Sequence, residues 1–322
     1  MKIKLPILLA AGLFCLMSCS KKATDPNRTM EAPSGYMNET FLKISYALGM
    51  LDLIEAKPGV PDDILEIKNI EYKKVDTISL QLDLYKSKSL KKPAPVMIFI
   101  HGGAWKSGKR SDYLSYLVAY AQKGYVAVTV SYRLAKVAKF PAAVQDVNCA
   151  VQWVRDHADE YGIDASRIVL IGGSAGGHLS MMAGYAEDEP LFNEGCYAQN
   201  SGKVKAVINL YGVADLTTPE SKIRKEPLNF IGANYDEKPE MYKMASPRFF
   251  ITSDDPPTLT FHGTIDSIVP VSQSDSLDIW LKEAGVPHDY HRLKGWPHTM
   301  DLAVKVNEYC RFYIDEFLAK HL

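Results

Sequence analysis

Residues 171–178 read IGGSAGGH, and this stretch decides the fold because it joins a strand to a helix through a serine among glycines. The strand-forming letters RIVL precede it, and the helix-forming letters LSMMAGYAE follow it. The G-x-S-x-G pattern predicts a strained turn that exposes Ser174 between strand and helix. Side chains at Gly172 and Gly176 would collide with the neighbouring strand and helix, so both positions demand glycine. Free N–H groups at a helix N-terminus favour negative charge, which makes Ser174 a candidate nucleophile.

Continuous apolar strands alternate with helical patterns on both sides of this turn. Apolar strands without polar alternation are buried on both faces, so the sequence predicts an α/β fold with a mainly parallel central sheet and helices on both faces. One further strand, TISLQLDLY at 77–85, alternates apolar and polar residues and is expected to be antiparallel and half-exposed. The expected buried strands are 95–101, 125–132, 167–173, 203–212, 257–263 and 288–295, and the expected helices are 111–124, 141–162, the segment after Ser174, 271–285 and the C-terminal segment.

A serine hydroxyl needs a base to take its proton, and His298 is the best candidate among eight histidines. It lies in GWPHTM, on a loop expected at the same sheet edge as Ser174. His178 follows the turn on its own helix and is expected to point away from it. Four other histidines are expected to have structural rather than catalytic roles, because they lie within a helix, on a strand or near the C-terminus. They are His157, His288, His291 and His321.

Asp266 is the expected carboxylate partner of that base, because it directly follows the strand PTLTFHG in FHGTIDSIVP. The resulting chain order of Ser174, Asp266 and His298 is the order of α/β hydrolases. Asp215 remains an alternative acid, whereas Asp275 and Asp278 fall on the following helix.

An oxyanion cradle is predicted in HGGAW at 101–105, directly after the strand PVMIFI. Small residues there let backbone N–H groups turn toward a carbonyl oxygen. The expected donors are the N–H groups of Gly103 and Ala104, joined by that of Ala175.

Three aromatic residues are candidate substrate contacts, with ordinary packing as the alternative for the tryptophans. Trp105 follows the oxyanion loop, Trp296 lies two residues before His298, and Tyr211 precedes the variable segment 213–255. That segment is expected to form a small cap over the cleft.

The motifs HGGAW, SYRL with FPAAVQD, YGIDASRIVLIGGSAGGH, FHGTIDSIVP and WPHT together resemble the α/β-hydrolase esterases related to hormone-sensitive lipase, over residues 68 to 320. The resemblance implies a serine carboxylesterase without metal or organic cofactor: Ser174 attacks, His298 acts as base and then acid, and Asp266 orients His298. Ala104 departs from the HGGG form of the motif but keeps its N–H. No long apolar lid is evident in the sequence, which favours short or soluble acyl esters. The export expected from the N-terminus suggests carbohydrate-linked substrates, such as acetyl or feruloyl esters of polysaccharides.

Other functional classes fit the sequence less well. A prolyl-oligopeptidase-like peptidase shares the serine turn, an arylformamidase shares the HGGxW loop, and an inactive binding module should have lost a triad member. The run from Gly103 to Lys109 nearly spells a phosphate-binding loop, but Arg110 stands where Ser or Thr should hold Mg²⁺. The formal net charge of −1 gives no basic field for nucleic acid.

The N-terminus predicts export to a bacterial cell envelope. Lys2 and Lys4 precede an apolar run that is too short to span a bilayer, so residues 1–18 are expected to be a lipoprotein signal peptide. Cys19 would be lipidated and would anchor the protein to a membrane, an ordinary signal peptide being the alternative. A flexible tether is expected over 19–38 and a helical cap segment over 39–66, before the catalytic domain at 67–322.

Three cysteines follow the tether, namely Cys149, Cys196 and Cys310. They have no metal-ligand spacing and allow at most one bridge. Core thiols are the preferred interpretation.

Overall fold

The computed structural model describes residues 29–55, 57–196 and 201–322. The predicted signal peptide, the predicted lipidation site Cys19 and the first part of the expected tether lie outside these residues. None of the helices within the described ranges is long and apolar enough to cross a membrane.

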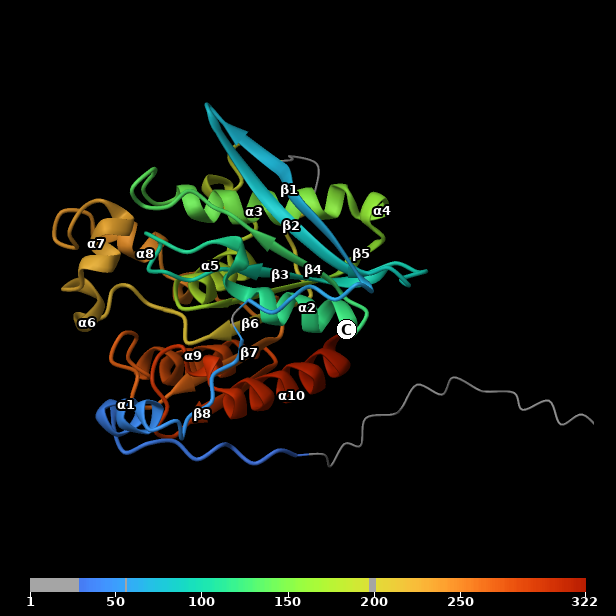
Figure 1. Ribbon diagram of the computed structural model, residues 1–322. Coiled ribbons are helices and arrows are strands. Elements are labelled where there is room, and N and C mark those ends of the chain that lie inside the picture. The colour runs from blue at the N-terminus through green and yellow to red at the C-terminus, as the bar shows by residue number, and fades with distance from the viewer. Residues whose placement is uncertain (1–28, 56, 197–200) are drawn as a thin grey trace, which may run out of the picture.

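One eight-stranded sheet organises the chain, with strand order β1-β2-β4-β3-β5-β6-β7-β8 (Figure 1). The pairs β1–β2 and β2–β4 are antiparallel and the remaining pairs are parallel, which confirms the predicted α/β-hydrolase fold class. The strands are β1 (Ile64–Val75), β2 (Ile78–Ser87), β3 (Ala94–Ile100), β4 (Val126–Val130), β5 (Ile163–Gly173), β6 (Ala206–Leu210), β7 (Thr258–Gly263) and β8 (His288–Leu293).

Helices cover both faces of this sheet. One face packs against α3, α5 and α9, and the other packs against α2 and α10. Within β3, Ile98 and Ile100 belong to the first core while Met97 and Phe99 belong to the second, as expected for a strand buried on both faces. The helices are α1 (Glu39–Ala47), α2 (Leu114–Gln122), α3 (Ala142–Asp156), α4 (Ala158–Tyr161), α5 (Ala175–Tyr185), α6 (Pro219–Lys222), α7 (Lys225–Ile231), α8 (Pro239–Met244), α9 (Ser272–Ala284) and α10 (Val304–His321).

The variable segment 213–255 contains α6, α7 and α8, which gather at one end of the sheet (Figure 1). Their core contacts come from Phe230, Ile231 and Tyr242, which join the cluster around α3 and α5. The segment is therefore a small helical cap on the main domain rather than an irregular loop.

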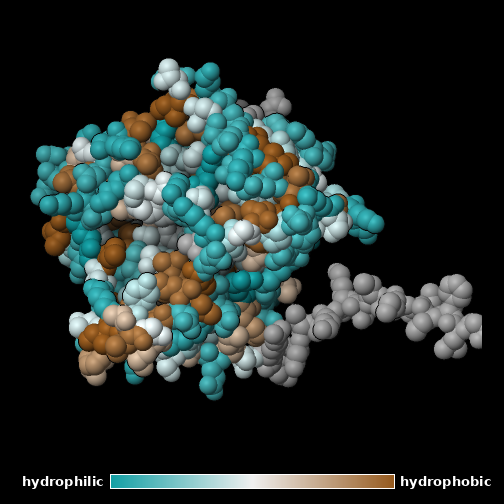
Figure 2. Space-filling model, viewed as in Figure 1, coloured by the Kyte–Doolittle hydropathy of each residue, from teal (hydrophilic) through white to brown (hydrophobic). Residues whose placement is uncertain are grey.

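The region expected to be a helical cap segment, 39–66, differs from the prediction. Among the described residues of this range only α1 is helical, and none of its residues is buried. β1 begins at Ile64, inside the expected cap. β2 is also more buried than expected over Leu82–Tyr85, because β1 and β4 flank it on both sides. Apolar side chains gather at the lower left of the space-filling view, where α1 lies (Figure 2).

Residues 29–38, expected to belong to a flexible tether, run along the main domain as a strap. Trp296 donates its indole N–H to the carbonyl oxygen of Pro33 at 2.9 Å, and the Tyr36 N–H donates to the carbonyl oxygen of Gly295. A Cβ atom at Gly35 would lie 2.3 Å from the carbonyl oxygen of Lys294, so the strap fits closely against the loop after β8.

A disulfide joins Cys149 in α3 to Cys196, with their Cα atoms 4.8 Å apart. The preference for core thiols was wrong for this pair, because folding brings residues 47 apart in sequence side by side. Cys310 is a buried free thiol, as expected.

Candidate active site

Ser174 lies at the sharp turn between β5 and α5, with φ of 57° and ψ of −121°. The turn admits no side chains at its glycines: a Cβ atom at Gly172 would lie 2.4 Å from the carbonyl carbon of Gly176, and one at Gly176 would lie 2.0 Å from the carbonyl oxygen of Ile100. The expected steric demand at these two positions is confirmed. A non-glycine residue held at positive φ is strained, which is typical of nucleophile turns.

His298 and Asp266 meet through their side chains. His298 Nδ1 lies 2.6 Å from Asp266 Oδ2, and the carboxylate side chain is fully buried. The loops carrying them lie close together, since a Cβ atom at Gly263 would lie 2.0 Å from the carbonyl oxygen of Trp296. Because a carboxylate accepts, Nδ1 carries the proton in this contact and Nε2 is left to accept a proton from a nucleophile.

Asp266 is held by more than His298. Its Oδ1 accepts hydrogen bonds from the backbone N–H groups of Ile268 and Val269 at 2.9 and 2.8 Å. Burial by itself would raise the pKa of Asp266, but hydrogen bonds from His262 and His298 outweigh burial and hold this pKa well below its usual range. The carboxylate therefore stays ionised beside the imidazole.

His262 is a site residue that the sequence reasoning missed. Its Nε2 lies 2.9 Å from the carbonyl oxygen of Val269 and 3.2 Å from Asp266 Oδ2, and its Nδ1 lies 2.7 Å from Ser274 Oγ. The carbonyl oxygen can only accept, so Nε2 is the donor and Nδ1 accepts from the serine hydroxyl. A histidine at the end of the apolar strand PTLTFHG, four residues before Asp266, was the available signal.

Asp215, the alternative acid, is engaged elsewhere. Its Oδ2 pairs with Arg248 Nη1 at 2.8 Å, and its Oδ1 accepts from the N–H of Thr217 at 2.7 Å. These contacts tie the start of the cap to the segment before β7.

The loop after β3 brings the expected oxyanion donors to the serine turn. Gly102 leaves no room for a side chain, because a Cβ atom there would lie 2.8 Å from the carbonyl oxygen of Gly173. Ala104 and Trp105 adopt positive φ values of 52° and 55°, so strained backbone flanks the serine on this side as well. Ala104 and Ala175 border one cavity with Ser174, and Gly103 borders another.

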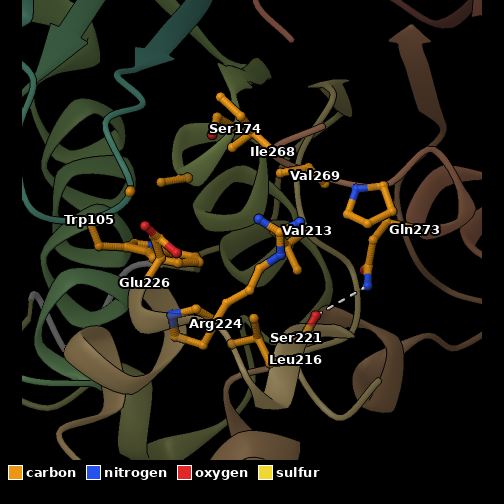
Figure 3. A pocket seen from close by; sticks show the side chains of 14 residues that line it. Trp105, Ser174, Val213, Leu216, Ser221, Arg224, Glu226, Ile268, Val269 and Gln273 are labelled. Carbon is orange, nitrogen blue, oxygen red and sulfur yellow. Dashed lines mark hydrogen bonds between the residues drawn. The ribbon is translucent and has the colours of Figure 1, made fainter. Parts of the chain in front are cut away.

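Ser174 lies between two cavities of different size. The smaller, about 40 Å³, is lined by the cap and the oxyanion loop, with Trp105, Val213 and Arg224 among its walls (Figure 3). The larger, about 600 Å³, also has His298 and Tyr211 in its wall. In Figure 3 the Arg224 side chain extends from the cap into the smaller cavity, and its Nη2 donates to the carbonyl oxygen of Ser267 at 3.2 Å.

The three aromatic candidates have different surroundings. Trp105 is only 3% exposed and stacks on Phe230, with ring centroids 4.5 Å apart, while lining the smaller cavity. The Tyr211 ring lies edge-on to the imidazole of His298 at 4.7 Å. Trp296 is not brought into this set, because its indole turns toward the strap and packs edge-on against Tyr36.

No group of three or more His, Cys, Asp or Glu side chains suited to a metal ion occurs among the described residues. The three residues of the predicted triad, Ser174, Asp266 and His298, follow the carboxyl ends of β5, β7 and β8, where a parallel sheet gathers its ligand-binding loops.

Several known proteins with a similar sequence or fold are esterases. The chain is 33% identical over 229 residues to the esterase LipC of Mycobacterium tuberculosis, covering 69% of this chain and 57% of LipC. It spans about half the length of the curated relatives it matches.

Two solved structures cover most of the chain. A truncated carbohydrate esterase from gut microbiota superposes with a TM-score of 0.72 at 26% identity, over 82% of this chain and 99% of that one. Esterase 2 of Thermogutta terrifontis superposes with a TM-score of 0.70 at 28% identity, over 83% and 95% of the two chains. The model of the BD-FAE family matches residues 82–281. The chain therefore belongs to the BD-FAE family and has the α/β-hydrolase fold shared by these esterases.

Proposed function

We propose that this protein is a serine carboxylic ester hydrolase acting on short-chain or carbohydrate-linked esters. The observation that carries the proposal is the 2.6 Å contact between His298 Nδ1 and Asp266 Oδ2, made beside a cavity that His298 and Ser174 both border. An imidazole held in this tautomer presents Nε2 to take a proton from a serine hydroxyl.

The reaction follows from the positions of these groups. Ser174 Oγ attacks the ester carbonyl carbon while His298 takes the hydroxyl proton, and the oxyanion turns toward the N–H groups of Gly103, Ala104 and Ala175. His298 then gives its proton to the alkoxide oxygen, the alcohol leaves, and an acyl group remains on Ser174. A water molecule then attacks the acyl carbon while His298 takes its proton. The bond from that carbon to Ser174 Oγ breaks as His298 returns the proton to Oγ, and the acid leaves.

The positions of the two cavities support an assignment of the substrate's two halves. The acid that protonates the leaving oxygen must lie within hydrogen-bond reach of it, so the alcohol belongs on the side of His298, in the cavity of about 600 Å³. The acyl group then falls in the cavity of about 40 Å³. Because one water needs roughly 10–15 Å³ by this measure, the smaller cavity suits an acetyl-sized group better than a feruloyl group.

The test is hydrolysis of p-nitrophenyl acetate, butyrate and octanoate by residues 20–322, with Ser174→Ala and His298→Ala alongside. Loss of about 10⁴ to 10⁶ in kcat in each variant is expected, because members of a triad act as a unit. Activity unchanged in Ser174→Ala would refute the nucleophile. If the protein cleaves no ester but cleaves a prolyl amide or an arylformamide, it belongs to the peptidase or arylformamidase class instead. If it turns over none of these substrates, a binding module is favoured.

The proposal extends to location: a signal peptide over 1–18 and lipidation at Cys19 would hold the enzyme at the membrane of a bacterial cell envelope. Mass spectrometry of the mature N-terminal peptide tests this. A diacyl or triacyl mass on Cys19 is expected, and an unmodified peptide would contradict it.

A further inference from the structure

A second buried carboxylate lies in the wall of the larger cavity. Asp301, three residues after His298, is 3% exposed and lines the same cavity as Ser174, His298 and Tyr211. The triad does not use it, because Asp266 is the carboxylate on His298 Nδ1.

Tyrosines surround Asp301. The Tyr211 hydroxyl donates to Asp301 Oδ1 at 2.5 Å. Tyr116 lines the same cavity, and its buried hydroxyl lies in the electrostatic field of Asp301 without a hydrogen bond of normal geometry to any described residue. Burial raises the pKa of Asp301, as expected where water is scarce.

The chemistry of a carboxylate limits which ligand groups can bind against this wall of the cavity. When ionised, the Asp301 carboxylate only accepts hydrogen bonds and offers about four lone-pair sites. Tyr211 fills one of these sites, and the Tyr116 hydroxyl and the backbone N–H of Asp301 also stabilise the charged form. An alcohol that brings a hydroxyl can donate to the remaining sites. An apolar alcohol would displace water from the carboxylate without replacing the lost hydrogen bonds. Sites built to hydrogen-bond a ligand hydroxyl therefore reject ligands that lack it.

We propose that Asp301, with Tyr211 and Tyr116, binds a free hydroxyl of the alcohol part of the substrate and so selects esters of polyhydroxylated alcohols such as sugars. The inference rests on the proposed esterase activity and assigns its alcohol specificity. Asp301 is a binding residue in this account, and the bonds made and broken are those of the esterase reaction.

The test compares two acetates of similar ring size, methyl monoacetyl-β-xylopyranoside and cyclohexyl acetate, by the ratio of their kcat/KM values. The wild-type enzyme is expected to favour the sugar ester by at least tenfold. Asp301→Asn should lower that ratio about tenfold, because a hydrogen bond to a charged acceptor is roughly twice as strong as one to a neutral acceptor. Tyr116→Phe, which removes only a hydroxyl, should lower the ratio several-fold and serves if Asp301→Asn does not fold.

The control is Asp112→Asn, the same charge change at an exposed position of the same cavity, where the carboxylate already accepts the N–H of Lys109 at 3.0 Å. An equal fall of the ratio in this variant would attribute selectivity to the overall charge of the cavity and overturn the role of Asp301. If Asp301→Asn lowers kcat/KM equally for both acetates, Asp301 positions His298 instead of binding the alcohol. If the wild type cleaves both acetates equally well, this inference fails while the esterase proposal stands; if it cleaves neither, the esterase proposal fails first.

Discussion

Trp105 donates its indole N–H to His178 Nδ1 at 3.2 Å, and this bond ties the loop after β3 to α5, the helix whose N-cap is Ser174. His178 Nε2 lies 2.8 Å from the carbonyl oxygen of Ala245 in the cap, so one imidazole connects three parts of the active site. Nδ1 must accept and Nε2 must donate, which requires the neutral ring. Burial lowers the pKa of His178 to about 4, in agreement with this requirement.

This bond predicts a pH dependence of stability. The unfolded chain binds a proton at His178 near pH 6.5, whereas the folded protein binds it only near pH 4. Stability from this residue is therefore complete above about pH 6.5 and falls as the pH drops toward 4. Thermal unfolding of His178→Asn and wild type, compared between pH 4.5 and 7.5, should show a smaller acid loss in the variant. Because the pKa of His291 is also lowered to about 4, His291→Asn is the matched comparison.

Asp266→Asn is expected to lower kcat by about 10³ to 10⁴, because an amide beside Nδ1 favours the wrong imidazole tautomer. The same substitution at Asp215, which pairs with Arg248, should disturb the cap more than the chemistry. Steady-state kinetics on p-nitrophenyl acetate decides between them. If kcat stays near the wild-type value in Asp266→Asn but falls about 10³-fold or more in Asp215→Asn, the carboxylate of the triad is Asp215.

His262→Phe should lower kcat about ten- to hundredfold with little change in KM, because Asp266 loses a donor and gains freedom to turn away from His298. His262→Gln, which can restore an N–H near the carboxylate, should recover part of the loss. Both are measured beside a thermal melt to show that the variants fold. An equal defect in the two variants would point to packing at this position instead.

Arg224 limits acyl length in the proposed assignment, because its side chain extends into the cavity of about 40 Å³. Arg224→Ala should therefore raise kcat/KM for p-nitrophenyl butyrate relative to acetate, by about three- to tenfold for the extra methylenes. Lys225→Ala, an exposed neighbour that does not line this cavity, is the control. An unchanged ratio in Arg224→Ala would place the acyl group elsewhere.

The disulfide between Cys149 and Cys196 should add about 2–4 kcal/mol to the free energy of unfolding, because it closes a loop of 47 residues in the unfolded chain. Cys196→Ser should lower the free energy of unfolding by that amount and the melting temperature with it, and reductant should do the same to the wild type. In denatured residues 20–322, thiol titration should count one free thiol before reduction and three after it. Three thiols in the untreated, air-oxidised protein would contradict the bridge.

Local features of this fold could be predicted from sequence, whereas features made by distant contacts could not. The Ser174 turn was predictable because its glycines exclude side chains within one short segment. Strand β1 was missed because ILEIKNIEYKKV mixes charges with apolar residues, and its register shifts twice along β2.

The side chains around the proposed triad illustrate the same limit. Proximity in sequence to His298 made Trp296 a substrate candidate, yet its indole turns toward a strap some 260 residues earlier. His262, four residues before Asp266, could have been noticed in the sequence. The contact of Asp301 with Tyr211, 90 residues earlier, could not, because it depends on the folding of distant segments.

The strap also sets a boundary for protein engineering. Pro33 and Tyr36 bond to Trp296 and Gly295, directly before the loop that carries His298. A chain shortened past residue 36 would leave the indole N–H of Trp296 without its acceptor and would uncover the ring two positions from the proposed base, His298. The minimal active fragment therefore starts ahead of the strap, well upstream of the first strand.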